Sequence, residues 1–365
     1  MIARMVVRNL AHRPIRTFLS VLAVAVEVAM ILLIVGLSEG LLLESMRRTK
    51  GVGADILIRP STSSAAMSLS TADIPEALVD KLAATFPEIR LATGMTVNMG
   101  EGLQSISGVD WQKIQEMSGG IRYLAGGPLQ QPFDAIVDEI FARHQKLSVG
   151  DSLRLLNQDF RVVGIVESGK MSRIFIPKAT MQELMGWNGR LSQIFLKLED
   201  PSKTRELVEK IHGMLPSYPV WSMEDFLAHV TADVRGMSSQ FVNVIIGIAV
   251  IIGFIVVLLS MYTAILERTR EIGILKSLGA SGGYIMSIVI RETLAICAGG
   301  ILLGFALSFL GEVIVESRFP LITIILFPAW MLWGALIAVV GSTLGAFYPA
   351  TRAARQDTIE ALSYE

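Results

Sequence analysis

The sequence predicts a membrane protein in which an all-α four-helix transmembrane domain carries an α+β domain inserted between its first and second spans. Composition supports the membrane assignment: of 365 residues, 52% are hydrophobic and 18% charged, and mean hydropathy is +0.54, unlike an ordinary soluble domain. The apolar residues gather in four long stretches, whereas 44–240 has ordinary soluble composition. Net charge is −1, so no global basic field indicates a nucleic-acid partner.

The four apolar stretches predict four spans. Residues 1–17 predict a cytoplasmic amphipathic helix, and the first span follows over 18–43. Its apolar core, from Phe18 to about Leu37, exceeds the roughly 7–15 residues of a signal-peptide core, and a poor cleavage site follows, so we interpret it as a retained helix. The stretches 241–266, 293–315 and 327–347 are each long enough to cross, since about 20 residues suffice.

Basic residues near the ends of the spans predict the orientation. Lys and Arg concentrate in short cytoplasmic segments. Here they cluster in the N-terminal tail, between the second and third spans, and in the tail 348–365 (Arg4, Arg8, Arg13, Arg16; Arg268, Arg270, Lys276; Arg352, Arg355). We therefore expect both termini in the cytoplasm, N-in/C-in, with 44–240 on the extracytoplasmic, periplasmic side.

The inserted domain alternates strand and helix patterns. Short β-rich runs predict strands at 55–59, 89–99, 103–109, 173–177 and 194–198, and helical periodicity predicts helices over 75–86, 179–185 and 204–215. Two alternating runs, 150–156 and 160–166, flank the residues 157–159 and predict a hairpin. This mixture indicates an α+β domain.

No pattern in the sequence indicates catalysis or a metal. Within 44–240, Gly-x-Ser-x-Gly and His-Glu-x-x-His are absent, and the single cysteine of the chain, Cys297, excludes an internal disulfide and a cysteine-based zinc site. Asp138, Glu139 and His144 come close together, but acidic residues at the start of a short helix and a histidine at its end are what the helix dipole favours. We expect no catalytic residue, metal or cofactor in this chain.

The segment 267–292 contains the most informative stretch, ERTREIGILKSLGA at 267–280. It predicts a short charged helix whose apolar stripe comprises Ile272, Leu275 and Leu278. Gly279 suits the position that ends the helix, and Ser281 can cap the next one. Periodicity alone leaves two interpretations open: an element that sits in a partner's groove, or an ordinary cytoplasmic turn with a solvated face.

Glu27 is the one charge well inside a span. An intramembrane carboxylate is costly and is therefore a functional candidate. Either it lies near the cytoplasmic face and pairs with Arg16 or Arg13, or it faces a dimer interface.

Nowhere does the sequence contain Gly-x-x-x-x-Gly-Lys-Ser/Thr, the loop whose backbone amides hold nucleotide phosphates. If ATP is used, we expect another chain to hydrolyse it.

Two motifs resemble those of one family. ERTREIGILKSLGA and YPATRAARQDTIEAL at 348–362 are similar to the cytoplasmic segment and C-terminal signature of FtsX-like/MacB-like ABC permeases, the mechanotransmission group. The resemblance extends to NLAHRPIRT at 9–17, LSVGDSL at 147–153 and FRVVGIV at 160–166. One departure is Thr358, where the family usually has proline.

The resemblance implies a non-catalytic permease subunit of the cytoplasmic (inner) membrane, paired with itself or a paralogous permease. Each copy would bind a separate ATPase, which holds ATP and Mg²⁺ and moves the external domain through the first two spans. It implies that the ATPase docks on the cytoplasmic segment (Glu267, Arg268, Arg270, Glu271, Ile272, Gly273, Leu275, Lys276, Leu278, Gly279).

Three functions fit this resemblance. One is export of a drug, peptide, lipid or haem-like substrate, with a periplasmic adaptor and an outer-membrane duct. The others are release of lipoproteins from the membrane, and signalling that activates a cell-wall hydrolase.

Overall fold

The computed structural model describes residues 13–60, 72–99, 105–319 and 321–356, and the chain forms two compact units. The helical unit comprises Met1–Gly40, Ser238–Arg318 and Ile324–Glu365. The sheet unit comprises Leu41–Met237 and a short return segment, Phe319–Thr323. Parts of the predicted terminal segments 1–17 and 348–365, including Thr358, lie outside the described residues.

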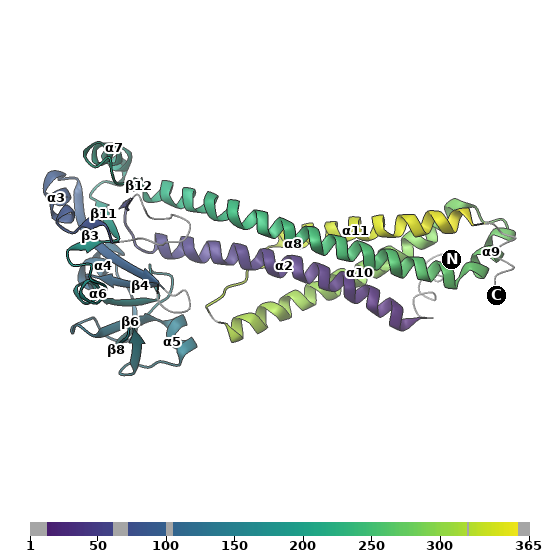
Figure 1. Ribbon diagram of the computed structural model, residues 1–365, viewed down its shortest axis with the longest axis horizontal. Helices are drawn as coiled ribbons and strands as arrows, with labels where there is room; N and C mark the ends of the chain where they lie inside the picture. Colours follow the sequence, from purple (N-terminus) through teal and green to yellow (C-terminus); the bar gives the residue numbers. More distant parts are fainter. Residues whose placement is uncertain (1–12, 61–71, 100–104, 320, 357–365) are drawn as a thin grey trace. The chain divides into compact units, whose positions relative to one another are not determined.

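Four helices are long and apolar enough to cross a membrane within the described part of the chain: α2 (Pro14–Lys50), α8 (Met223–Glu267), α10 (Gly282–Arg318) and α11 (Pro328–Arg355) (Figure 1). A short helix, α9 (Thr269–Ser277), follows α8. Four candidate spans with an α+β unit between the first two are thus confirmed.

Glycines bring the helices of the helical unit into close contact. On α10, a Cβ at Gly300 would lie 2.6 Å from Val24 Cβ, and one at Gly304 would lie 2.8 Å from Val28 Cβ. Small residues allow such approach, and in lipid close packing is a main source of helix association. These contacts fix α10 against α2.

The sheet unit is built on ten strands among its described residues, in the order β12-β1-β11-β3-β4-β9-β6-β8-β5, with β7 paired to β8. Their bounds are β1 (Ile56–Ile58), β3 (Ile89–Met99), β4 (Ser105–Val109), β5 (Tyr123–Gly126), β6 (Asp134–Asp138), β7 (Ser152–Leu155), β8 (Gln158–Val166), β9 (Ile174–Pro177), β11 (Gln193–Leu198) and β12 (Val220–Ser222). A separate pair joins β2 (Ile74–Pro75) to β10 (Arg190–Leu191). The helices are α3 (Ala77–Thr85), α4 (Trp111–Met117), α5 (Glu139–Gln145), α6 (Lys178–Met185) and α7 (Thr204–Met214), with a 3₁₀ turn η2 (Pro201–Lys203).

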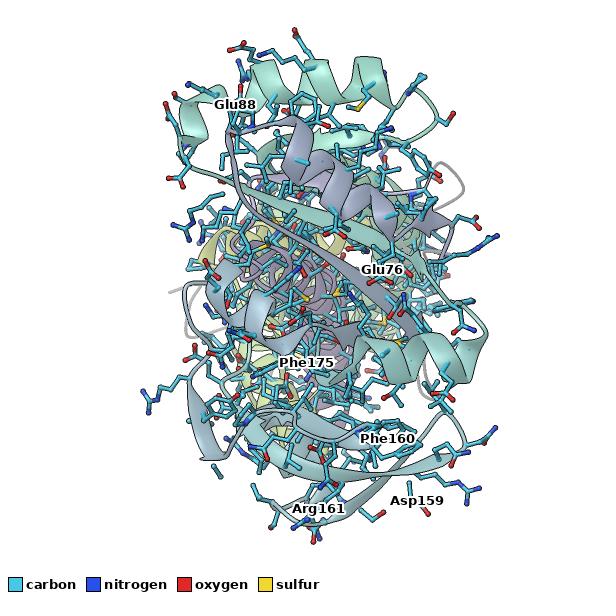
Figure 2. All side chains as sticks on the ribbon, turned by 90° about the vertical axis from the view of Figure 1, so that its left-hand side faces the viewer. Glu76, Glu88, Asp159, Phe160, Arg161 and Phe175 are labelled. Atoms are coloured by element: carbon cyan, nitrogen blue, oxygen red, sulfur yellow. The ribbon has the colours of Figure 1, made fainter. Side chains whose placement is uncertain are left out.

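The long strand β3 connects the two halves of this sheet. Its residues 89–95 pair with β11 and its residues 96–99 with β4. One apolar cluster lies in the half that contains β1 and β11 and another in the half that contains β6 and β8, while a third includes residues of both halves. The fully buried rings of Phe160 and Phe175, labelled in Figure 2, belong to β8 and β9. The helices cover the apolar sheet faces.

The predicted hairpin forms, but its turn is tighter than expected. Leu155 pairs with Gln158, so the turn contains only Leu156 and Asn157, and β8 already begins at Gln158. Both turn residues have positive φ, 51° and 61°. A two-residue turn of this handedness matches the twist of the strands, and asparagine tolerates the conformation. The expected three-residue connection 157–159 was wrong for this reason.

Candidate functional site

The segment after α8 folds as the short helix α9, which a break at Arg268 separates from α8. The helical path breaks at Arg268 (φ −114°, ψ 19°), and α9 then runs to Ser277. Gly279, with φ +95°, ends the helix in the left-handed conformation that glycine adopts without strain. The Ser281 hydroxyl accepts from the Tyr284 amide at 3.3 Å and caps α10. The predicted roles of these two residues are confirmed.

The predicted apolar stripe of α9 does not form one exposed face. Ile272 is 8% exposed and Gly273 is buried, and Leu275 packs partly into the apolar cluster formed by α8, α9 and α10. Leu278, by contrast, is 80% exposed. One of the two interpretations left open by periodicity placed this stripe in a partner's groove, but Ile272 and Leu275 pack within the helical unit instead.

A different set of side chains is exposed on α9. Ile274 is 45% exposed and lies outside the predicted stripe, and Arg270, Glu271 and Gly279 are also exposed. With Leu278 they make up what we call the α9 surface. It combines two apolar side chains with one positive and one negative charge, a composition suited to contact with another protein.

Ion pairs hold this segment to the rest of the helical unit. Arg268 lies 3.1 Å from Glu271 and 3.2 Å from the buried Glu292 of α10. The Lys276 amine donates to the Gln356 carbonyl at 2.6 Å, beyond the end of α11. Through Glu292 and the Gln356 carbonyl, Arg268 and Lys276 are therefore occupied in fixing the position of α9.

The other member of the predicted docking set, Glu267, also has partners within the unit. Its carboxylate lies 2.7 Å from Arg13 and 2.9 Å from Arg16 at the start of α2. The contact ties the end of one candidate span to the beginning of another. Nearby, Arg352 of α11 donates to the Tyr262 hydroxyl and lies over its ring, 5.0 Å from the ring centre to the guanidinium carbon.

The predicted pairing of Glu27 with Arg16 or Arg13 was wrong, and its predicted position at a dimer interface stays a prediction. Arg13 and Arg16 pair with Glu267, and Glu27 is only 5% exposed because it points into the helical unit. A Cβ on Gly253 of α8 would lie 1.8 Å from its Oε2 atom. Sequence reasoning missed Gly253, since a glycine in an apolar helix gives no sign of what it accommodates.

The sheet unit contains a charged cluster at the end of α2. Arg48 donates to Glu44 at 2.8 Å and to Asp138 at 2.9 Å, and Arg173 lies 3.6 Å from Glu44. Arg173 also donates to the Leu321 carbonyl of the return segment at 3.1 Å. Burial, and then the neighbouring Arg48, lower the pKa of Arg173 against the opposing effect of the two carboxylates. The cluster joins α2, β6, β9 and the return segment.

Asp138 has a structural role in this cluster. Its side chain is almost fully buried, and it accepts from the Phe141 amide at 2.7 Å as the N-cap of α5. Asp138, Glu139 and His144 come close together in the sequence, and the helix dipole accounts for these residue types without a metal site. Within the described ranges no group of three His, Cys, Asp or Glu side chains is arranged to hold a metal ion.

Two family models match the chain in succession. The MacB-like periplasmic core domain matches residues 17–213, and the FtsX-like permease C-terminal model matches 243–358. The chain belongs to the FtsX-like/MacB-like family of ABC transporter permeases. The first match includes the hairpin β7–β8, and the second includes the whole of α9.

Relatives of this permease are similar at a low level of identity. It is 28% identical over 261 residues to the uncharacterized ABC transporter permease YknZ of Bacillus subtilis, covering 67% of this chain and 63% of YknZ. It is 27% identical over 398 residues to the macrolide export ATP-binding/permease protein MacB of Nitrobacter winogradskyi, covering 99% of this chain and 60% of that protein. The permease thus spans less than two thirds of the length of either relative.

One solved structure similar to this permease is the periplasmic region of MacB from Actinobacillus actinomycetemcomitans. The TM-score is 0.40 at 14% identity, covering 50% of this chain and 94% of the solved one.

Proposed function

We propose that this permease works with an ATPase carried on a separate polypeptide and exports a substrate by moving its sheet unit. The observation that carries the proposal is the α9 surface, an exposed part of a helix that ion pairs and packing hold in place, in a chain of the ABC transporter permease family. No nucleotide-phosphate loop occurs in these 365 residues, so none of them is assigned to ATP hydrolysis.

The ATPase docks on the exposed part of the predicted segment: Arg270, Glu271, Ile274, Leu278 and Gly279. The remaining predicted residues act indirectly. Ile272, Gly273 and Leu275 anchor α9 by packing, and Glu267, Arg268 and Lys276 anchor it through their ion pairs and hydrogen bond. A force applied to α9 is therefore passed directly to α2, α8, α10 and α11.

In the proposed orientation, both termini and α9 are cytoplasmic and the sheet unit is extracytoplasmic, in the inner membrane. Two continuous helices run from one unit into the other: α2 begins in the helical unit and ends in the sheet unit, and α8 does the reverse. The return segment is a further covalent link between the units. Two permease copies, identical or paralogous, act together, each with its ATPase and ATP with Mg²⁺ bound there. A periplasmic adaptor and an outer-membrane duct complete the export route.

Export is favoured over lipoprotein release and over hydrolase signalling by one observation. The relative that covers nearly the whole chain, MacB of Nitrobacter winogradskyi, is named for macrolide export. The substrate class proposed here remains the broad one of drugs, peptides, lipids and haem-like molecules.

Co-purification tests the docking surface. The tagged permease would be isolated from its native membrane as wild type, as Ile274→Asp/Leu278→Asp, and as Leu124→Asp, a control that places one such charge on an apolar residue of the sheet unit as exposed as Ile274. We expect an ATPase to accompany wild type and the Leu124 variant but not the double variant. Since both α9 positions are exposed, the double variant should remain folded.

The other proteins in the wild-type sample separate the three functions. An adaptor supports export, a cell-wall hydrolase supports signalling, and lipoproteins support the release function. Absence of any ATPase from the wild-type complex in several mild detergents would refute the proposal.

Labelling tests the orientation. Cysteines would be introduced at Ser277 on α9 and at Asp159 on the β7–β8 hairpin, both exposed, in a Cys297→Ala background (Figure 2). A membrane-impermeant maleimide added to spheroplasts should label position 159 and leave 277 unlabelled until the membrane is broken. The reverse pattern would contradict the N-in/C-in orientation.

A further inference from the structure

Glu27 occupies a niche made by glycines inside the helical unit. It lies within the candidate span of α2 and is 5% exposed. Gly253 of α8 leaves the space that its Oε2 atom fills, and a Cβ on Gly341 of α11 would lie 4.0 Å from Oε1. Any side chain at position 253 would displace the carboxyl group, so the niche and the acid fit each other.

No Lys, Arg or His among the described residues forms an ion pair with Glu27 in this niche. Val24, about one turn before Glu27 on α2, and Val28, directly after it, are fully buried, and α8 contributes Gly253 to the wall of the niche. The titratable group that faces Glu27 from α10 is the thiol of Cys297, with the hydroxyl of Ser342 from α11 beside that thiol. The Oε1 atom has no hydrogen-bond partner among the described residues.

An ionised carboxylate is poorly accommodated in such surroundings. A buried charge without a counter-ion is strongly disfavoured, and a group that can take up a proton becomes neutral instead. The nearest arginines at the start of α2 are already paired with Glu267. The neutral acid has the additional advantage of a hydroxyl that can donate to a neighbouring oxygen.

We infer that Glu27 is a proton-binding site: it is protonated while α2, α8 and α11 are packed together, and it exchanges its proton with water when they separate. In the exchange the Glu27 carboxylic acid transfers its proton to a water molecule, leaving a carboxylate and a hydronium ion. The carboxylate takes up a proton again before it re-enters the niche. The protonated state stands on the geometry alone, whereas its release by ATP-driven movement rests on the proposed function.

Infrared spectroscopy of the purified chain in lipid tests the protonated state. At about pH 7, well above the ordinary glutamate pKa of about 4.3, we expect a carboxylic-acid carbonyl band that shifts in D₂O. The band should be absent from Glu27→Gln, a near-isosteric change, and retained in the control Glu312→Gln, which alters a partly exposed acid of α10. Loss of the same band in Gly253→Ala gives an independent check if the first variant does not fold.

Two results would overturn the inference. A wild-type spectrum with no carboxylic-acid band at this pH refutes the protonated state. If the band is present, the rate at which it shifts after transfer to D₂O should rise several-fold when a bound ATPase hydrolyses ATP, and an unchanged rate refutes release during the cycle. Should no ATPase bind, the proposed function fails while the band still decides the protonated state.

Discussion

Substitutions of Asp138 separate two contributions of this side chain to stability: the N-cap of α5 and the ion pair with Arg48. In Asp138→Asn the amide oxygen can still accept from the Phe141 amide, because asparagine is as good an N-cap as aspartate. The negative charge opposite Arg48 is lost, however. In Asp138→Ala both the cap and the charge are lost.

The magnitude follows from burial. Removing one partner of a buried ion pair costs about 3–5 kcal/mol, and the lower end applies because Arg48 keeps its 2.8 Å contact with Glu44. We therefore expect the Asn variant to lose about 3 kcal/mol of unfolding free energy, and the Ala variant about 1 kcal/mol more for the lost cap. With a urea dependence of about 2–3 kcal/mol per M, the midpoint falls by roughly 1–1.5 M for Asn.

Pulse proteolysis of the full-length chain in nanodiscs across a urea series measures these midpoints for the sheet unit. A double variant, Arg48→Met with Asp138→Asn, is the control: because it removes both charges, it should recover part of the loss. Equal midpoints for the Asn variant and wild type would refute the ion pair. Equal midpoints for the Asn and Ala variants would refute the cap.

Three further predictions concern single residues. Burial raises the pKa of Glu76 (Figure 2), but hydrogen bonds from Lys178 and Gln182 lower it by more, so the folded-state pKa lies below the ordinary value. The ionised carboxylate therefore stabilises the fold above about pH 4.5, and this stabilisation is lost as pH falls through the folded-state pKa. Urea titration at each pH should show an acid-induced loss of up to about 1 kcal/mol in wild type and a smaller loss in Glu76→Gln. Asn157→Val should cost about 1–2 kcal/mol by the same urea assay, because a β-branched residue is strained at positive φ, whereas Asn157→Gly should not destabilise. Gly304→Val should lower the temperature at which the helical unit unfolds, measured by the heat-induced change in far-ultraviolet circular dichroism; no loss would refute the tight α2–α10 contact.

Local patterns predicted most elements because the signals involved are local. About 20 consecutive apolar residues predict a span, and a single residue, Gly279, predicts the end of α9. The helix α4 escaped prediction, although Asp110 caps it through the Lys113 amide, because it has only seven residues and no extended periodicity. The order of the strands in the sheet could not be predicted from local patterns, because β4 pairs in parallel with β9, a strand from a distant part of the chain.

The candidate site shows where such reasoning ends. Periodicity placed Ile272, Leu275 and Leu278 on one face, but it carries no information on what that face meets. Burial against α10 takes the first two into the unit's own core and leaves Leu278 with Ile274 outside. Ion pairs are equally non-local, because Arg16 pairs with Glu267 rather than with Glu27, which is eleven residues away in the sequence.

The return segment has a consequence for biosynthesis. Leu321 packs into the sheet unit's core with Phe141 and Phe160, and Arg173 needs its carbonyl, yet it is synthesised roughly 85 residues after that unit's main stretch ends at residue 237. At about 5–20 residues per second, the ribosome delivers it some 4–17 s later. Until two more spans have been synthesised, the apolar surface of the sheet unit that Leu321 covers stays exposed. A chaperone is most useful to the sheet unit during this period.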